Sequence, residues 1–477
     1  MIRLSSFGSS LFLIGFLLPS ICAQTSGKLI YLRGETRSAT GITAQLGSDG
    51  TVVSASLLPC SNCHGLDGRG KVEGGLSAPN IRSVELTKPY PVMSGGRRRP
   101  AYDESSLRRA IAMGIDSGGN PLSSAMPRYR MSHADMNELL SYLKTVGSPD
   151  PGFSGDAVRI GVFLPPAGPL AEARRLLLLN FFAEANKKGI YGRRVELVFS
   201  NAPPQPGAIA SAIRGFIERN NLFALLSSYV AGAEKEVSAI IGTAAIPVVG
   251  AVSLYPYLDK PPNPNLFYLY SGVPGQAEAL VATINPKTDS KISASILYTG
   301  ENSKAVAEFI AAQRGWKTVE TGNMPDIKFL SDGIQKSGHQ AILLLCPPRI
   351  TEPLLSEVAR RPGLKTTFLI PGSLASPALL EVPFDLSNPV VFAFPERNPG
   401  SSGESEAFAE ARILLEGLVR AGRDLSRDRL ILALEGLYNF DSGSAPVSFA
   451  PNRRIGVTGI QLVSIDPQSG KLQPLPK

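Results

Sequence analysis

The sequence predicts a multidomain fold, in which a small all-α domain precedes a larger, two-lobed α/β domain. A chain of 477 residues is longer than one hydrophobic core normally serves. Residues 147–152 read Gly-Ser-Pro-Asp-Pro-Gly, a combination typical of a linker. Beyond this run, apolar strand-like stretches alternate with amphipathic helical stretches, which indicates a mostly parallel sheet covered by helices.

The first 23 residues have the features of a secretory signal peptide. Arg3 supplies a positive charge, residues 11–18 are apolar, and Ile21 and Ala23 suit a signal-peptidase cut after Ala23. The apolar run is too short to span a bilayer. Lipidation at Cys22 is an alternative, although Pro-Ser-Ile is a poor context for it. We therefore expect a periplasmic protein without residues 1–23.

Cys60-Ser-Asn-Cys63-His64 is the attachment signal of a c-type haem. Cys60 and Cys63 would form thioethers with the macrocycle, and His64 would be the proximal ligand of its iron. Two other uses of the cysteines agree less well with the sequence. A thioredoxin-like dithiol requires a helix that continues from the motif, whereas Gly65 and further glycines follow it. A zinc site requires more ligands than a chain with three histidines offers at this spacing.

The second axial ligand is expected to be Met126, in the run Ala-Met-Pro that precedes a strong helical pattern. Ser132, with Asp135 three residues later, predicts the start of that helix. Met131 and His133 are the alternative ligands. A thioether ligand would raise the reduction potential relative to a bis-histidine site.

With these motifs, residues 24–147 resemble a class I cytochrome c domain. The match includes Ala78-Pro79-Asn80 as well as the haem motif, the Ala-Met-Pro run and the closing helix. The resemblance implies that the carbonyl group of Pro79 accepts a hydrogen bond from His64. It also implies one covalent haem c and a periplasmic redox partner protein.

The charge of the chain argues against nucleic acid as a partner. The formal net charge is +8, which is modest for this length, and the basic residues are dispersed. The densest basic run is Arg97-Arg98-Arg99, in a stretch rich in glycine and proline. This run is interpreted either as a solvated loop or as a docking patch for an acidic redox partner.

After a linker at residues 148–154, residues 155–477 resemble the type I periplasmic binding proteins of the branched-chain amino acid and amide group, which are leucine-binding-protein-like. The resemblance rests on the order of several weak motifs, among them Ile160–Pro165, Asn180–Leu197 and Ala245–Val249. It implies two lobes that close on a small-molecule ligand, and an ABC permease as a further partner.

In such proteins hydroxyl groups and backbone amides hold the carboxylate of the ligand. The matching positions here are Ser228, Tyr229 and Ser253. The same serines can equally be ordinary loop residues. The family's hydroxyl-rich loops are reduced in this chain, and its usual arginine is missing from residues 266–270. These differences weaken the match to proteins that bind a free amino acid, and the expected ligand is an amino-acid-like or other small solute.

Two functions follow. The first is a periplasmic electron carrier with one covalent haem, fused to a solute-binding or sensing domain. The alternative is the substrate-binding protein of an ABC transporter, with a structural or sensory haem. The sequence contains no evident catalytic constellation, so we expect a carrier or binding protein rather than an enzyme.

Overall fold

The computed structural model describes most of the chain and divides it into two compact units, Met1–Ser148 and Pro149–Lys477. The described residues are 21–47, 50–94, 96–258, 261–284, 293–361, 363–376, 379, 388–396, 405–465 and 472–475. Most of the predicted signal peptide, residues 1–20, lies outside them. Among the described residues, no helix combines the length and the apolar character that crossing a membrane requires.

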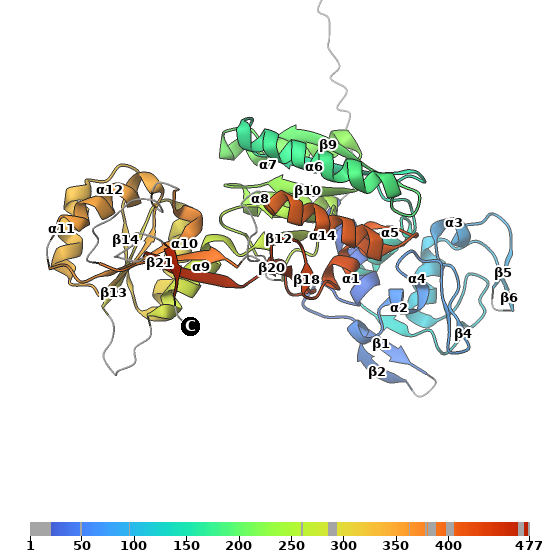
Figure 1. Cartoon of the computed structure of the whole chain (residues 1–477). Helices are drawn as coiled ribbons and strands as arrows, with labels where there is room; N and C mark the ends of the chain where they lie inside the picture. The colour runs from blue at the N-terminus through green and yellow to red at the C-terminus, as the bar shows by residue number, and fades with distance from the viewer. Residues whose placement is uncertain are drawn as a thin grey trace, which may run out of the picture. The chain divides into compact units, whose positions relative to one another are not determined.

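The core of the first unit is built from helices, as the sequence predicts, with loops and short strands between them (Figure 1). Its helices are α1 (Ile21–Arg33), α2 (Cys60–His64), α3 (Ser83–Leu86), α4 (Glu104–Met113) and α5 (His133–Leu143), with one 3-10 turn, η1 (Ala55–Leu57). Its strands are β1 (Thr43–Leu46), β2 (Thr51–Ser54), β3 (Val72–Glu73), β4 (Leu76–Ser77), β5 (Val92–Ser94), β6 (Arg97–Arg99) and β7 (Arg128–Arg130). Strands β2, β1 and β7 form an antiparallel sheet.

Helices α1 and α5 pack closely and form the core of this unit. A Cβ atom on Gly27 would lie 2.0 Å from the carbonyl oxygen of Glu138, so only glycine permits this helix–helix distance. Tyr31, Leu139 and Leu140 are buried in the shared core. The predicted start of α5 is confirmed, since the hydroxyl of Ser132 accepts a 3.0 Å hydrogen bond from the backbone N–H of Asp135.

The first lobe of the second unit contains a parallel six-stranded sheet with the order β20-β12-β11-β10-β8-β9. Its strands are β8 (Ala157–Leu164), β9 (Arg194–Asn201), β10 (Ala224–Tyr229), β11 (Val248–Val252), β12 (Leu266–Tyr270) and β20 (Ile455–Val457). Its helices are α6 (Pro169–Lys188), α7 (Ile209–Asn220), α8 (Glu234–Ala244), α14 (Ser405–Ala421) and α15 (Arg427–Glu435). Short elements complete it: η2 (Pro206–Ala208), β18 (Phe440–Asp441) and β19 (Pro446–Val447).

Both faces of this sheet are buried, which explains why its strands are almost continuously apolar. Because side chains alternate along a strand, Val162 enters the core that contains residues of α6, α14 and α15, while Phe163 enters the core formed with α7 and α8. The predicted α/β architecture is confirmed in this lobe.

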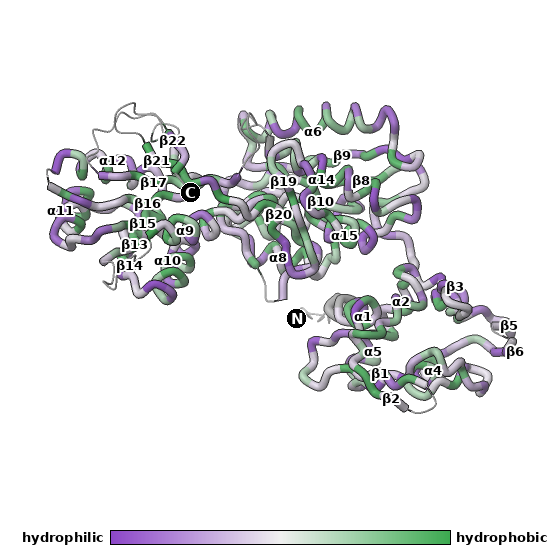
Figure 2. The backbone as a smooth tube through the Cα atoms, turned by 60° about the horizontal axis from the view of Figure 1, so that its bottom comes forward, coloured by the Kyte–Doolittle hydropathy of each residue, from purple (hydrophilic) through white to green (hydrophobic). Residues whose placement is uncertain are grey.

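The second lobe has a seven-stranded sheet with the order β14-β13-β15-β16-β17-β21-β22. Its strands are β13 (Ala294–Tyr298), β14 (Lys317–Glu320), β15 (Ala341–Leu345), β16 (Thr367–Pro371), β17 (Val390–Pro395), β21 (Ile460–Ile465) and β22 (Leu472–Pro474). Its helices are α9 (Gly272–Thr283), α10 (Glu301–Arg314), α11 (Ile327–Ser337) and α12 (Pro348–Ala359), with the 3-10 turn η3 (Gly372–Leu374). Hydrophobic residues follow the central strands of this sheet (Figure 2).

The chain passes between the two lobes three times: from β12 to α9, from β17 to α14, and from β20 to β21. In the sheet of the second lobe, neighbouring strands are parallel from β14 to β17, and the returning strand β21 pairs with β17 in the antiparallel direction. Each lobe is therefore built from segments that are not contiguous in sequence, so that neither lobe is a separate stretch of chain.

Candidate functional site

Helix α2 contains the predicted haem motif in five residues. It begins after Pro59, whose backbone is extended, and ends at Gly65, which has a φ of 77°. One turn of helix brings the first and fourth residues of the motif close together. The Cys60 side chain lines a pocket and that of Cys63 is exposed. A thioredoxin-like dithiol would require a helix that continues beyond the motif, whereas this helix stops at His64.

Two tyrosines from distant parts of the sequence hold the ends of α2. The hydroxyl of Tyr129 donates a 2.6 Å hydrogen bond to the carbonyl oxygen of Leu58, just before the helix. The hydroxyl of Tyr31 donates a 2.7 Å bond to the carbonyl oxygen of Gly65, just after it. Neither tyrosine was identified from the sequence, because neither lies in a recognisable motif.

The imidazole of His64 is buried and has a fixed orientation. Its Nδ1 lies 2.9 Å from the carbonyl oxygen of Pro79, which can only accept a hydrogen bond. Nδ1 therefore carries the proton, and Nε2 keeps a lone pair for a metal. Burial lowers the pKa of His64, while the bond to Pro79 acts in the opposite direction, so the neutral form is favoured near neutral pH.

The Pro79 loop is held against the haem motif by Gly70. Its N–H donates a 2.8 Å hydrogen bond to the carbonyl oxygen of His64. A Cβ atom there would lie 2.1 Å from the carbonyl oxygen of Ala78, and the φ of Gly70 is 86°. Both observations require glycine at this position.

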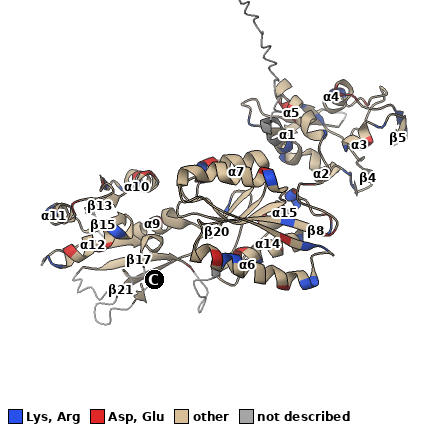
Figure 3. Cartoon of the chain, turned by 90° about the horizontal axis from the view of Figure 1, so that it is seen from above, with Lys and Arg blue, Asp and Glu red and all other residues tan. Residues whose placement is uncertain are grey.

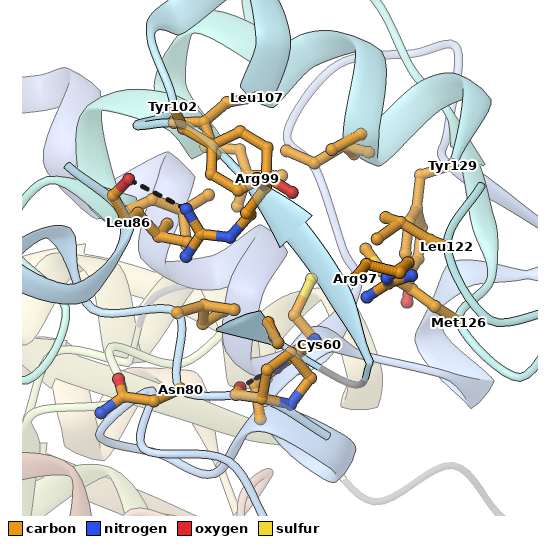
Figure 4. Close-up of a pocket in the computed structure, with 18 residues that line it drawn as sticks. Cys60, Asn80, Leu86, Arg97, Arg99, Tyr102, Leu107, Leu122, Met126 and Tyr129 are labelled. Carbon is orange, nitrogen blue, oxygen red and sulfur yellow. Dashed lines mark hydrogen bonds between the residues drawn. The ribbon is translucent and has the colours of Figure 1, made fainter. Parts of the chain in front are cut away.

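One pocket brings together most of the predicted haem residues. Cys60, His64, Pro79 and Met126 all line it, and it encloses about 770 Å³ free of protein atoms, in part open to solvent (Figure 4). The other lining residues are Asn80, Ile81, Leu86, Ser94, Arg97, Arg99, Tyr102, Leu107, Ala110, Ile111, Leu122, Tyr129, Leu139 and Leu143.

The alternative axial ligands lie elsewhere. Met131 packs, partly buried, against the core that contains α1 and α5. His133 is exposed at the first residue of α5. Neither lines the pocket, whereas Met126 does. The geometry therefore favours Met126 as the second ligand.

The chemistry of the pocket fits a haem c. Its wall is largely apolar, and it offers a thiol, a neutral imidazole and a thioether, which are the groups that attach and ligate such a haem. Burial raises the pKa of Cys60 to about 12. A reactive dithiol needs a lowered thiol pKa, so this environment disfavours a thioredoxin-like activity. Among the described residues, no cluster of three or more His, Cys, Asp or Glu side chains could hold a bare metal ion.

The three predicted solute-site residues lie at the carboxyl ends of β10 and β11. Ser228 is fully buried, and the nearest partner of its hydroxyl is the carbonyl oxygen of Leu226, at 3.5 Å. Tyr229 is partly buried, and burial together with the nearby charge of Glu234 raises the pKa of its hydroxyl. The hydroxyl of Ser253 accepts a 2.9 Å hydrogen bond from the N–H of Tyr255 and donates one to Glu234.

Glu234 therefore occupies the place that a ligand carboxylate was expected to take. It is the first residue of α8 and is buried. Its Oε1 accepts a 3.0 Å hydrogen bond from the N–H of Gly232 and a second from Ser253. The Ser253 hydroxyl, one of the three groups expected to bind a solute, is thus already used within the lobe.

A buried ionic cluster lies on the same sheet, between α6 and α14. Arg174 donates to the Ser227 hydroxyl at 2.8 Å, to Glu406 at 2.6 Å and to Glu410 at 3.4 Å. Burial raises the pKa of Glu410 to about 8; Arg174 opposes this rise and the charge of Glu406 adds to it. With Glu410 protonated, one arginine balances one glutamate, so the cluster is neutral.

Two family models match parts of the chain. A family model described as cytochrome c matches residues 55–147, and one described as periplasmic binding protein matches residues 157–385. Among curated protein sequences, none matches the chain.

Solved structures similar to the chain are substrate-binding proteins. A fatty acid ABC transporter substrate-binding protein from Thermomonospora curvata is 19% identical, with a TM-score of 0.54, over 69% of this chain and 93% of the other. A branched chain amino acid ABC transporter protein from Thermus thermophilus, with bound valine, is 17% identical, with a TM-score of 0.53, over 68% and 95%. A leucine binding protein from Thermotoga maritima is 15% identical, with a TM-score of 0.52, over 67% and 98%. At identities this low, the structural similarity establishes a shared fold and no more.

Proposed function

Since the chain consists of a cytochrome c domain and a periplasmic binding protein domain, we propose that it is a periplasmic electron carrier with one haem c, fused to a module that binds or senses a small solute. The single observation that carries the proposal is the pocket in which Cys60, His64 and Met126 meet. The proposal includes export with removal of residues 1–23, since the families of both domains are typically periplasmic.

In this proposal Cys60 and Cys63 attach the haem, and His64 and Met126 ligate its iron. Haem c, when bound, supplies a one-electron couple between ferric and ferrous iron. The Pro79 carbonyl fixes the His64 ring, and the largely apolar wall would limit the access of water to a bound haem. Cys63 is exposed while Cys60 lines the pocket, so a haem held by both would be attached near the protein surface, where a partner protein could approach it.

The solute proposed for the second domain is not a free amino acid. The hydroxyl of Ser253 and the N–H of Gly232 already bind the carboxylate of Glu234. A solute carboxylate placed there would find these two donors occupied, and the carboxylate of Glu234 would repel it. An ABC permease as partner is part of the proposal only through the similarity of this domain to transporter proteins.

Covalent attachment tests the proposal directly. A Cys60→Ser/Cys63→Ser variant, exported in a host that matures c-type cytochromes, should lose all haem staining on a denaturing gel. Cys346→Ser is the matched control, because Cys346 is buried in the second lobe and should not affect staining. Haem staining retained by the double variant would refute the proposal.

A further inference from the structure

The basic run at residues 97–99 forms one strand of a two-stranded hairpin, β5–β6, rather than a loop. Its register pairs Val92 with Arg99, Met93 with Arg98, and Ser94 with Arg97. Because side chains alternate along a strand, Arg97 and Arg99 share one face and Arg98 has the other. Arg98 is exposed, whereas Arg97 and Arg99 line the haem pocket. Lys and Arg residues are visible at this hairpin in Figure 3.

Arg99 is a buried cation that is bonded mainly to neutral groups. It is 6% exposed and lies over the ring of Tyr102, at 4.7 Å from the ring centroid. It donates to backbone carbonyl oxygens of Glu85, Leu86 and Pro100 at 3.2–3.4 Å. Figure 4 shows the bond to Leu86. Among the described residues, no Asp or Glu forms an ion pair with it. These long bonds satisfy only some of the N–H donors of the guanidinium group, and neutral carbonyl groups do not compensate its positive charge.

Arg97 is also incompletely satisfied. One terminal nitrogen donates a 2.9 Å hydrogen bond to the carbonyl oxygen of Pro121. Its Nε is buried without a hydrogen-bond partner, 3.8 Å from Oδ2 of Asp116. This is a long ion pair, and Oδ2 of Asp116 also accepts a 3.2 Å hydrogen bond from the side-chain amide of Asn120. An unpaired donor of a guanidinium on a pocket wall indicates that its partner comes from whatever fills the pocket.

The lining residues of the pocket include these two arginines and no Asp, Glu or Lys. A pocket whose wall is apolar and carries two guanidinium groups, of which only that of Arg97 has a carboxylate nearby in the described part of the chain, suits a large apolar molecule with anionic groups. Haem c is such a molecule, since it has two propionate carboxylates. We infer that Arg97 and Arg99 bind these propionates. Arginine pairs with carboxylates through two parallel hydrogen bonds, which also restricts their orientation.

This inference rests on the proposed haem, so the test must report on the propionates themselves. Resonance Raman spectra of the full-length holoprotein contain a propionate bending band that responds to hydrogen bonding. We expect Arg97→Gln to shift this band and to lower the reduction potential, because a positive charge near the iron stabilises the ferrous state. Arg98→Gln removes the same charge from the outer face of the same strand. It should leave the band in place and change the potential less.

Arg97→Lys provides a second, milder variant. It keeps the positive charge but cannot form two parallel hydrogen bonds to one carboxylate. It should shift the Raman band while largely restoring the potential, and it replaces Arg97→Gln should that variant fail to fold. The same pair of substitutions at Arg99 tests the second propionate. A band unchanged in both Arg97 variants, or a change in potential equal to that of Arg98→Gln, would overturn the inference. Haem staining of each variant on a denaturing gel distinguishes the two failures. A stained protein with an unchanged Raman band contradicts the inference, whereas a wild-type protein without stain contradicts the proposed function.

Discussion

The Tyr31 hydroxyl donates a 2.7 Å hydrogen bond to the carbonyl oxygen of Gly65, which terminates the helix that presents His64. Tyr31 is fully buried, so its loss would leave a buried carbonyl group without a partner. We expect Tyr31→Phe to reduce the free energy of unfolding by about 1–3 kcal/mol. Chemical denaturation monitored by haem absorbance measures this. Tyr90→Phe is the control, because Tyr90 is 57% exposed, and an equal effect there would contradict the prediction.

Met126→Ala should change the visible spectrum of the oxidised protein and lower the reduction potential. The reason is that a thioether ligand favours ferrous iron, whereas water or a nitrogen ligand in its place favours ferric iron. Met131→Ala is the matched control, because Met131 packs in the core away from the pocket lining. Spectroelectrochemistry checks both variants. An unaltered spectrum for Met126→Ala, with an altered one for Met131→Ala, would reassign the ligand.

Glu410 should make the stability of the first lobe depend on pH. Its pKa is raised to about 8 in the folded protein by burial, from an ordinary value near 4.5. Between these two values the folded state binds more protons than the unfolded state, so stability is highest below about pH 4.5 and falls as pH rises toward about 8. One proton contributes at most about 1.4 kcal/mol per pH unit.

Glu410→Gln should remove this component, because an amide does not titrate. Denaturation followed by circular dichroism between pH 5 and pH 8 would show a smaller loss of stability in the variant than in the wild type. Glu184→Gln, at an exposed pair on α6, is the control and should keep the wild-type slope. Equal slopes in all three proteins would exclude Glu410 as the source.

Valine should not raise the melting temperature of the wild-type protein, even at millimolar concentration. The carboxylate of Glu234 already uses the Ser253 hydroxyl and the Gly232 N–H. A thermal-shift assay with neutral, cationic and anionic solutes measures this and searches for the actual ligand. A concentration-dependent rise with valine would show that Glu234 leaves the site, since a bound ligand stabilises the folded state by mass action.

The sequence predicts the haem motif, the start of α5 and the order of strands and helices, because these depend on local spacing and periodicity. It does not predict the role of Arg97 and Arg99. Their Gly- and Pro-rich surroundings indicate a loop, and strand alternation becomes visible only once β6 pairs with β5. Tyr129 and Leu58 are 71 residues apart, and no local pattern indicates their contact.

The same limit applies to the second domain. Ser253 was identified from its position after a strand, which is a local property. The hydrogen bond from Ser253 to Glu234 depends on how α8 packs beside the end of β11, because the two residues are 19 positions apart in the sequence. Tertiary contacts of this kind decide which polar groups remain free, and so they decide which ligands a fold can bind.

The contact between Tyr129 and Leu58 also makes the start of the helix with both thiols depend on a distant part of the chain, because 71 residues separate the two partners. Tyr129 lies in β7, so the segment just before Cys60 is anchored only when the chain extends as far as this strand. A chain truncated before β7 would lack this anchor.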